Sequence, residues 1–178
     1  MRTLCLFLLA SLPLCAQGVQ RDFVSKGRTI HYSAVVFDPP KKITAENGPI
    51  DQASPLNCVR LFWSRLSNLD IAGAAQLNTD PAREIELRSQ YKERVGEQAS
   101  SQMYAKVFND GGRFLCELVI DKAHALVNDK YSGSLFLFIE RDGKFWIDNT
   151  ETGHRSQQAN DLITLQNAFS DGKLNLRP

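Results

Sequence analysis

Five side chains between positions 104 and 148 are the candidates for a general acid or base, namely Tyr104, Glu117, His124, Tyr131 and Asp148. A group of this kind transfers a proton when it is aimed at a substrate in an enclosed cavity, as an isomerase or a dehydratase requires. The spacing of the five residues imposes no pairing. A His-Asp pair and an Asp with a proton-donating Tyr therefore both stay open.

Two of these groups, Glu117 and His124, are expected to face solvent. Glu117 lies with Asp121 on the strand face opposite Cys116, so both carboxylates point outward if the cysteine points into the core. His124 follows a polar turn, which favours an exposed position. We therefore assign no catalytic residue, and a small cavity enzyme stays the alternative to a binding protein.

Other motifs that carry chemistry are absent from the sequence. It contains no Gly-x-Ser-x-Gly, no phosphate loop and no dinucleotide fingerprint. Its three histidines are scattered and show no metal-ligand spacing with the cysteines. The sequence thus predicts no metal site and no cofactor.

Three aromatic residues are the candidates for ligand binding, because an aromatic ring in a cavity can stack against a ligand. They are Trp63, Tyr104 and Trp146. The alternative is that these rings pack in an ordinary hydrophobic core, where aromatic side chains contribute much of the buried area.

The first 16 residues have the pattern of a secretory signal peptide. Arg2 supplies the positive start, an apolar run extends from Leu4 to Leu14, and Ala16 is a small residue for cleavage. The run is too short to span a bilayer as a helix. A lipid anchor at Cys15 is less expected, because the large Leu14 precedes it. The predicted location is the periplasm or the exterior of the cell.

Removal of this segment would leave one pair of cysteines, Cys58 and Cys116. An even pair in an exported chain predicts a disulfide. Closure of a loop of this length would stabilise the fold by roughly 4 kcal/mol in the chain-entropy model. The alternative is two buried free thiols, because cysteine is often buried among apolar neighbours.

Composition excludes some classes of partner. The 178 residues include 21 basic and 20 acidic side chains, so the chain lacks the positive excess that would favour binding to nucleic acid or to an anionic membrane. No second apolar run is long enough to cross a bilayer, so we expect no integral membrane segment after signal cleavage.

The strongest local pattern is a pair of helices in residues 56–77. Leu56, Val59, Trp63 and Leu66 recur at three- and four-residue steps, which is typical of a helix with one apolar face. Ser54 and Pro55 mark its start, and Asp70 can cap the second helix. Asp80 and Pro81 begin a third, mostly charged helix whose polar face is expected to be solvated.

Strands follow these helices. The sequence predicts strands over residues 103–108, 113–121, 123–128, 134–141 and 144–148, and a short helix over 161–169. Asp142 and Gly143 are the strongest hairpin-turn signal. An earlier β-rich run over residues 29–37 is predicted to be an edge strand or an extended lead-in.

This order resembles the nuclear transport factor 2-like superfamily, whose members have a cone-shaped α+β fold. The resemblance rests on Phe62 and Trp63 in the first helix, Asp70 in the turn, and the small residues 72–75. Residues 136–149, with the sequence FLFIERDGKFWIDN, resemble the strand pair that closes the cone. The chain is thereby identified as similar to an exported bacterial member.

The resemblance implies a curved antiparallel sheet that surrounds the helical hairpin and the third helix and leaves a cavity at its open end. The resemblance covers residues 54–149, the predicted cone-like α+β domain. Outside it, the sequence predicts a signal peptide (1–16), an extended N-terminal segment with the candidate edge strand (17–53) and a C-terminal tail with a short helix (150–178). Members pair by the curved sheet, so a homodimer is an expected assembly.

The fold does not determine the function, because members of the superfamily bind apolar ligands, act as isomerases or dehydratases, or serve as non-enzymatic domains of exported proteins. Apolar strand positions outnumber inward polar ones here, which favours binding over catalysis. We therefore predict an exported non-catalytic protein that binds a small apolar ligand in the cavity or a protein partner on the sheet, for example as an immunity protein that neutralises a toxin. The alternative is a cavity isomerase or dehydratase.

Overall fold

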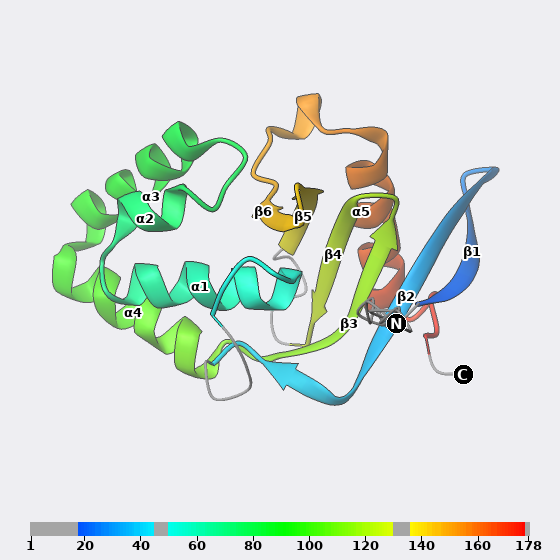
Figure 1. Ribbon diagram of the computed structural model, residues 1–178, viewed down its shortest axis with the longest axis horizontal. Coiled ribbons are helices and arrows are strands. Elements are labelled where there is room, and N and C mark those ends of the chain that lie inside the picture. Colours follow the sequence, from blue (N-terminus) through cyan, green and yellow to red (C-terminus); the bar gives the residue numbers. More distant parts are fainter. Residues whose placement is uncertain (1–17, 45–49, 130–135, 177–178) are drawn as a thin grey trace, which may run out of the picture.

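The structure is a computed structural model that describes residues 18–44, 50–129 and 136–176. Within these ranges it is an α+β fold, in which five α-helices pack against one open six-stranded antiparallel sheet (Figure 1). The predicted fold class is therefore confirmed, although the sheet does not close. The strands follow one another in chain order: β1 (Val19–Ser25), β2 (Arg28–Lys42), β3 (Arg113–Ile120), β4 (Ala123–Asn128), β5 (Phe136–Arg141) and β6 (Lys144–Ile147).

The helices begin and end where local signals place them. The side chain of Ser54 accepts a hydrogen bond from the Asn57 amide at the start of α1, and Asp70 and Asp80 cap α2 and α3 in the same way. Ser156 caps the last helix. The helices are α1 (Pro55–Ser67), α2 (Ile71–Ala75), α3 (Pro81–Val95), α4 (Glu97–Asp110) and α5 (Gln157–Ser170).

Helix α4 contradicts the strand predicted over residues 103–108. The alternation of Met103, Ala105 and Val107 fits a strand, but the buried side chains are Ser100 and Tyr104, which lie one helical turn apart. Tyr104 packs its ring 6.3 Å from that of Trp63 on α1. Tertiary packing against α1 therefore outweighs the local β pattern.

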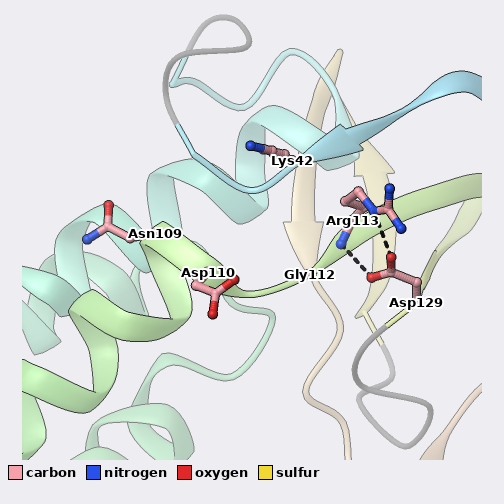
Figure 2. A pocket seen from close by; sticks show the side chains of 6 residues that line it. All are labelled: Lys42, Asn109, Asp110, Gly112, Arg113 and Asp129. Carbon is pink, nitrogen blue, oxygen red and sulfur yellow. Dashed lines mark hydrogen bonds and ion pairs between the residues drawn. The ribbon is translucent and has the colours of Figure 1, made fainter.

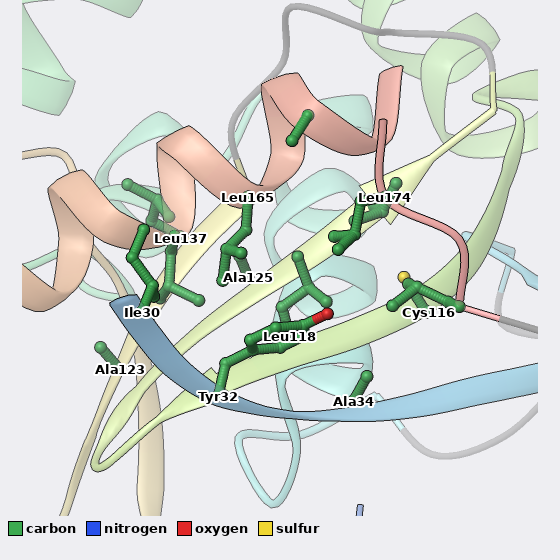
Figure 3. Packing of buried hydrophobic residues seen from close by; sticks show 14 of the residues in the cluster. Ile30, Tyr32, Ala34, Cys116, Leu118, Ala123, Ala125, Leu137, Leu165 and Leu174 are labelled. Carbon is green, nitrogen blue, oxygen red and sulfur yellow. The ribbon is translucent and has the colours of Figure 1, made fainter. Parts of the chain in front are cut away.

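Different helices cover the two faces of the sheet. The group α1–α4 lies on one face, where α1 contacts β4 and β6, and α5 lies on the other, where it contacts β3 and β4 (Figure 1). Figure 3 shows the core beneath α5, in which Tyr32, Leu118 and Leu165 meet. All six residues of β4 are buried, because this strand lies between both helical layers.

The predicted disulfide is wrong, because Cys58 and Cys116 lie on opposite sides of the sheet. A β-bulge interrupts β3, where the register changes between Phe114 and Cys116. Phe114 consequently packs with the α1 side, together with Cys58, whereas Cys116 packs with the α5 side. Both thiols are free and buried, and burial raises the pKa of each to about 12.

The N-terminal segment contributes two strands to the sheet rather than one. The predicted β-rich run is part of β2, and β1 pairs with it across the turn at Lys26 and Gly27 to form the actual edge. Both turn residues have positive φ, which suits a tight hairpin. Among the described residues, no helix is long and apolar enough to cross a membrane.

Candidate functional site

Trp63 and Tyr104 lie together, in a cluster of aromatic rings between α1, α3 and α4. The space between the rings holds a cation from the chain itself, because the guanidinium carbon of Arg88 lies 5.5–5.8 Å from the centroids of Phe62, Trp63 and Tyr104. The Nε atom of Arg88 donates to Glu84 Oε1 at 2.6 Å, and the Glu84 side chain is only 5% exposed. These two aromatic residues therefore surround an internal ion pair.

Trp146 lies elsewhere, beside a hollow of about 470 Å³ at the turn of the β5–β6 hairpin. The register pairs Ile139 with Trp146 and Phe138 with Ile147. Since Phe138 and Ile147 belong to the core under α1, Trp146 points to the opposite side of the sheet. We name this the Trp146 hollow, and its described lining residues are Asn78, Thr79, Pro81, Arg141, Asp142, Lys144 and Trp146.

Asn78 is an unusual residue to line this hollow, because part of its buried amide has no hydrogen-bond partner. The residue is 2% exposed, and its Nδ2 donates to the Ala74 carbonyl at 3.1 Å, but its Oδ1 has no hydrogen-bond partner. Backbone bonds hold the segment along the edge of β6, from Thr79 N to Ile147 O and from Ile147 N to Leu77 O. The position of the unpaired oxygen is thus fixed by the fold.

The charge around the Trp146 hollow is positive. Arg141 and Lys144 line it from the hairpin turn, together with the exposed Asp142. In the described part of the chain, none of these three forms an ion pair. Two free cations against one carboxylate give a net attraction for anions.

A second hollow, of about 400 Å³, lies where α4 leads into β3 (Figure 2). We name it the Arg113 hollow, and its described lining residues are Lys42, Asn109, Asp110, Gly112, Arg113 and Asp129. Asp129 accepts hydrogen bonds from the backbone N and the Nε of Arg113, at 2.7 and 2.8 Å. Burial alone would raise the pKa of Asp129, but the bonds from Arg113 outweigh it and hold the pKa below its usual value.

A third, more polar groove of about 620 Å³ runs between the β1–β2 hairpin and α5. Its central contact is an ion pair between Arg28 and Asp161, and Gln157 also donates to Asp161 at 2.8 Å. The hydrogen bond from Arg28 lowers the pKa of Asp161, which burial partly opposes.

Substitution of Asp161 by asparagine is expected to change how stability depends on pH. The folded pKa of Asp161 lies below the unfolded value of about 4, so the stabilisation is present above pH 4 and is lost as pH falls through the folded pKa. Urea unfolding at pH 7 and pH 2.5 should show a deficit for the variant at pH 7 that shrinks at pH 2.5. Asp171→Asn is the control, because its pair with Lys173 is exposed; an unchanged Asp161→Asn deficit at both pH values would contradict the assignment.

The predicted acid and base groups do not converge on one site. Glu117 and His124 form a pair, with His124 Nδ1 2.6 Å from Glu117 Oε1. His124 is 8% exposed and its ring meets that of Phe145 edge-on, so the prediction of an exposed histidine is wrong. Asp148 caps a turn by accepting from Thr150 N at 3.1 Å. Tyr131 lies outside the described residues.

The Glu117–His124 pair has the chemistry of a general base. His124 Nε2 is buried and has no hydrogen-bond partner. The pair lines none of the three hollows described above. The other two histidines, His31 and His154, are exposed, and within the described residues no three metal-ligating side chains gather.

Comparisons of the chain with protein-family models, with curated proteins and with solved structures found no match. Sequence patterns did not indicate Asn78, Arg88 or Glu84, because a single amide in a loop and a charged pair in a charged helix carry no distinctive signal.

Proposed function

We propose that this chain is an exported, non-catalytic binding protein whose ligand is a small molecule held in the Trp146 hollow. The observation that carries the proposal is that Asn78, which lines the hollow, has a buried Oδ1 without a hydrogen-bond partner. A buried acceptor without a partner costs about 1–3 kcal/mol. A ligand that brings an N–H or O–H group to this oxygen would recover that free energy on binding.

The other lining residues indicate which further chemical groups the ligand carries. Trp146 is half-buried and presents a flat apolar surface suited to a ring. Arg141 and Lys144 favour a negative group at the rim, where a charge mainly speeds association and selects among ligands. The ligand is thus a ring compound with one hydrogen-bond donor and an anionic substituent, which is more polar than the apolar ligand predicted from sequence.

Binding is favoured over catalysis because the titratable groups of the Trp146 hollow do not form an acid–base pair. They are two cations and one exposed carboxylate on a hairpin turn. The Glu117–His124 pair lies on the face of the sheet that α1 covers, whereas Trp146 points to the other face.

A matched pair of probes tests the role of Asn78. 4-Hydroxybenzoate and 4-methoxybenzoate share a ring and a carboxylate, but only the first has an O–H donor. We expect the first to bind more tightly by calorimetry, and we expect this preference to disappear in Asn78→Leu. Trp146→Ala should weaken both probes at least tenfold, whereas Asn109→Ala, in the Arg113 hollow, should change neither.

Three outcomes would contradict the proposal. Equal binding of both probes to the natural chain and to Asn78→Leu would remove the role of the amide. Unchanged binding by Trp146→Ala would move the site away from the hollow. Purification of the mature chain with a stoichiometric protein and without any small molecule would favour the alternative, a protein partner on the open part of the sheet.

A further inference from the structure

Arg60 is a buried cation without a counter-charge. It lies on α1 and is 1% exposed, and among the described residues no carboxylate pairs with it. Its guanidinium donates to the Lys42 carbonyl at 3.1 Å and to Asn57 Oδ1 at 3.3 Å, while Nε has no partner. Buried charges in proteins are normally paired, so this arrangement is costly for the fold.

The positive charge of Arg60 persists despite its burial. Burial lowers the pKa of its guanidinium, but an arginine remains protonated at neutral pH because its ordinary pKa is so high. A charge in a low-dielectric interior acts over a longer distance than a charge in water. The field of Arg60 therefore reaches the nearest open surface.

Lys42 links Arg60 to the Arg113 hollow. The carbonyl that accepts from Arg60 belongs to Lys42, and the Lys42 side chain lines the hollow (Figure 2). Lys42 is exposed and has no ion-pair partner in the described ranges. The Nε of Arg113 donates a hydrogen bond to Asp129, and the terminal nitrogens of the same guanidinium are left to donate to other groups.

The balance of charge in this region is positive. Lys42, Arg60 and Arg113 contribute three cations against the two carboxylates Asp110 and Asp129, which leaves one net positive charge. Asp129 is paired with Arg113, and neither Lys42 nor Arg60 forms an ion pair among the described residues. The volume of about 400 Å³ accommodates a phosphate group with a small substituent.

We propose that the Arg113 hollow binds a small phosphorylated anion. Lys42 and Arg113 contact the anion directly, and Arg60 supplies the buried positive charge behind the wall. This site is distinct from the Trp146 hollow, since it lies at the start of β3 and the end of β4 rather than at the β5–β6 turn. A failed test of ring binding in the Trp146 hollow would therefore not contradict the proposal of phosphate binding.

The test uses inorganic phosphate as the first probe, with sodium chloride at matched ionic strength as the reference. We expect phosphate to raise the Tm of the mature chain, and we expect Lys42→Gln to reduce the phosphate affinity at least fivefold. Lys26→Gln is the matched control, because it removes the same charge from the groove beside α5. Arg60→Met should also lose the response to phosphate while it remains folded.

Two further probes distinguish the source of the phosphate group. Glycerol 3-phosphate binding in solution would indicate a soluble ligand, whereas co-sedimentation with phosphatidylglycerol vesicles that depends on Lys42 would indicate a lipid headgroup. The proposal is overturned if phosphate stabilises no more than chloride. It is also overturned if Lys42→Gln responds like the natural chain, or if Lys26→Gln loses as much affinity as Lys42→Gln.

Discussion

Replacement of Arg88 by alanine is expected to destabilise the fold by about 3–5 kcal/mol, the cost typical of leaving a buried charge unpaired. Glu84 would keep its carboxylate in a site where its side chain is 5% exposed, without the Arg88 Nε that now lies 2.6 Å away. The three rings around Arg88 would also lose a cation, which contributes about 2 kcal/mol where it is desolvated.

Urea unfolding of the variant and of the natural chain measures this difference. Lys92→Ala is a suitable control, because Lys92 pairs with Glu97 on the exposed surface and should cost less than about 1 kcal/mol. A double variant, Glu84→Gln with Arg88→Met, should be more stable than Arg88→Ala, because it leaves no buried charge. A loss below about 1 kcal/mol for Arg88→Ala would show that the ion pair and the rings are energetically unimportant.

Replacement of Arg60 by methionine is expected to have the opposite sign and to stabilise the fold by about 1–3 kcal/mol. Methionine keeps the length of the buried stem and removes a charge that has no carboxylate partner among the described residues. Exchanges of buried ionic groups for apolar residues of similar volume are neutral or stabilising by up to about 4 kcal/mol. The lost bonds to Lys42 O and Asn57 Oδ1 offset part of the gain.

The matched comparison for Arg60→Met is Arg65→Met on the same helix. Arg65 is half-buried, and it donates to the Gly73 carbonyl without needing to desolvate its charge fully. Its replacement should not stabilise the fold. A decrease in the free energy of unfolding for Arg60→Met would mean that the buried guanidinium is already well compensated, which would also remove the energetic reason for an anion nearby.

The sequence predicted those parts of the fold that depend on neighbouring residues. The capped starts of α1, α2 and α3 follow from Ser54, Asp70 and Asp80, and the β5–β6 turn follows from Asp142 and Gly143. Each signal requires only a few consecutive residues. Local chemistry therefore accounts for where these elements begin and end.

The predictions that failed concern residues whose positions depend on contacts with distant parts of the chain. A regular strand over residues 113–121 would place Cys116 on the same face as Phe114, but the bulge between them sends each side chain to a different core. Glu117 and His124 were expected at the surface, whereas they meet across β3 and β4 as a pair. No pattern within either strand specifies which residue is displaced from the ladder.

The candidate site was predicted only in part. Trp146 does line a hollow, but Trp63 and Tyr104 surround Arg88, which resembled one more charge in a solvated helix. The resemblance to the nuclear transport factor 2-like superfamily stays a prediction. Its cone would hold helices on the inner side, whereas this chain also places α5 on the second face of an open sheet.

The complete burial of β4 has a consequence for how ligands act on the whole chain. Both helical layers contact this strand, so the detachment of either layer exposes buried side chains of β4 to water. Such a shared wall makes the two cores a single cooperative unit, in which partial opening is rare. A molecule bound at either end of the sheet would then protect every peptide bond of the core from proteases.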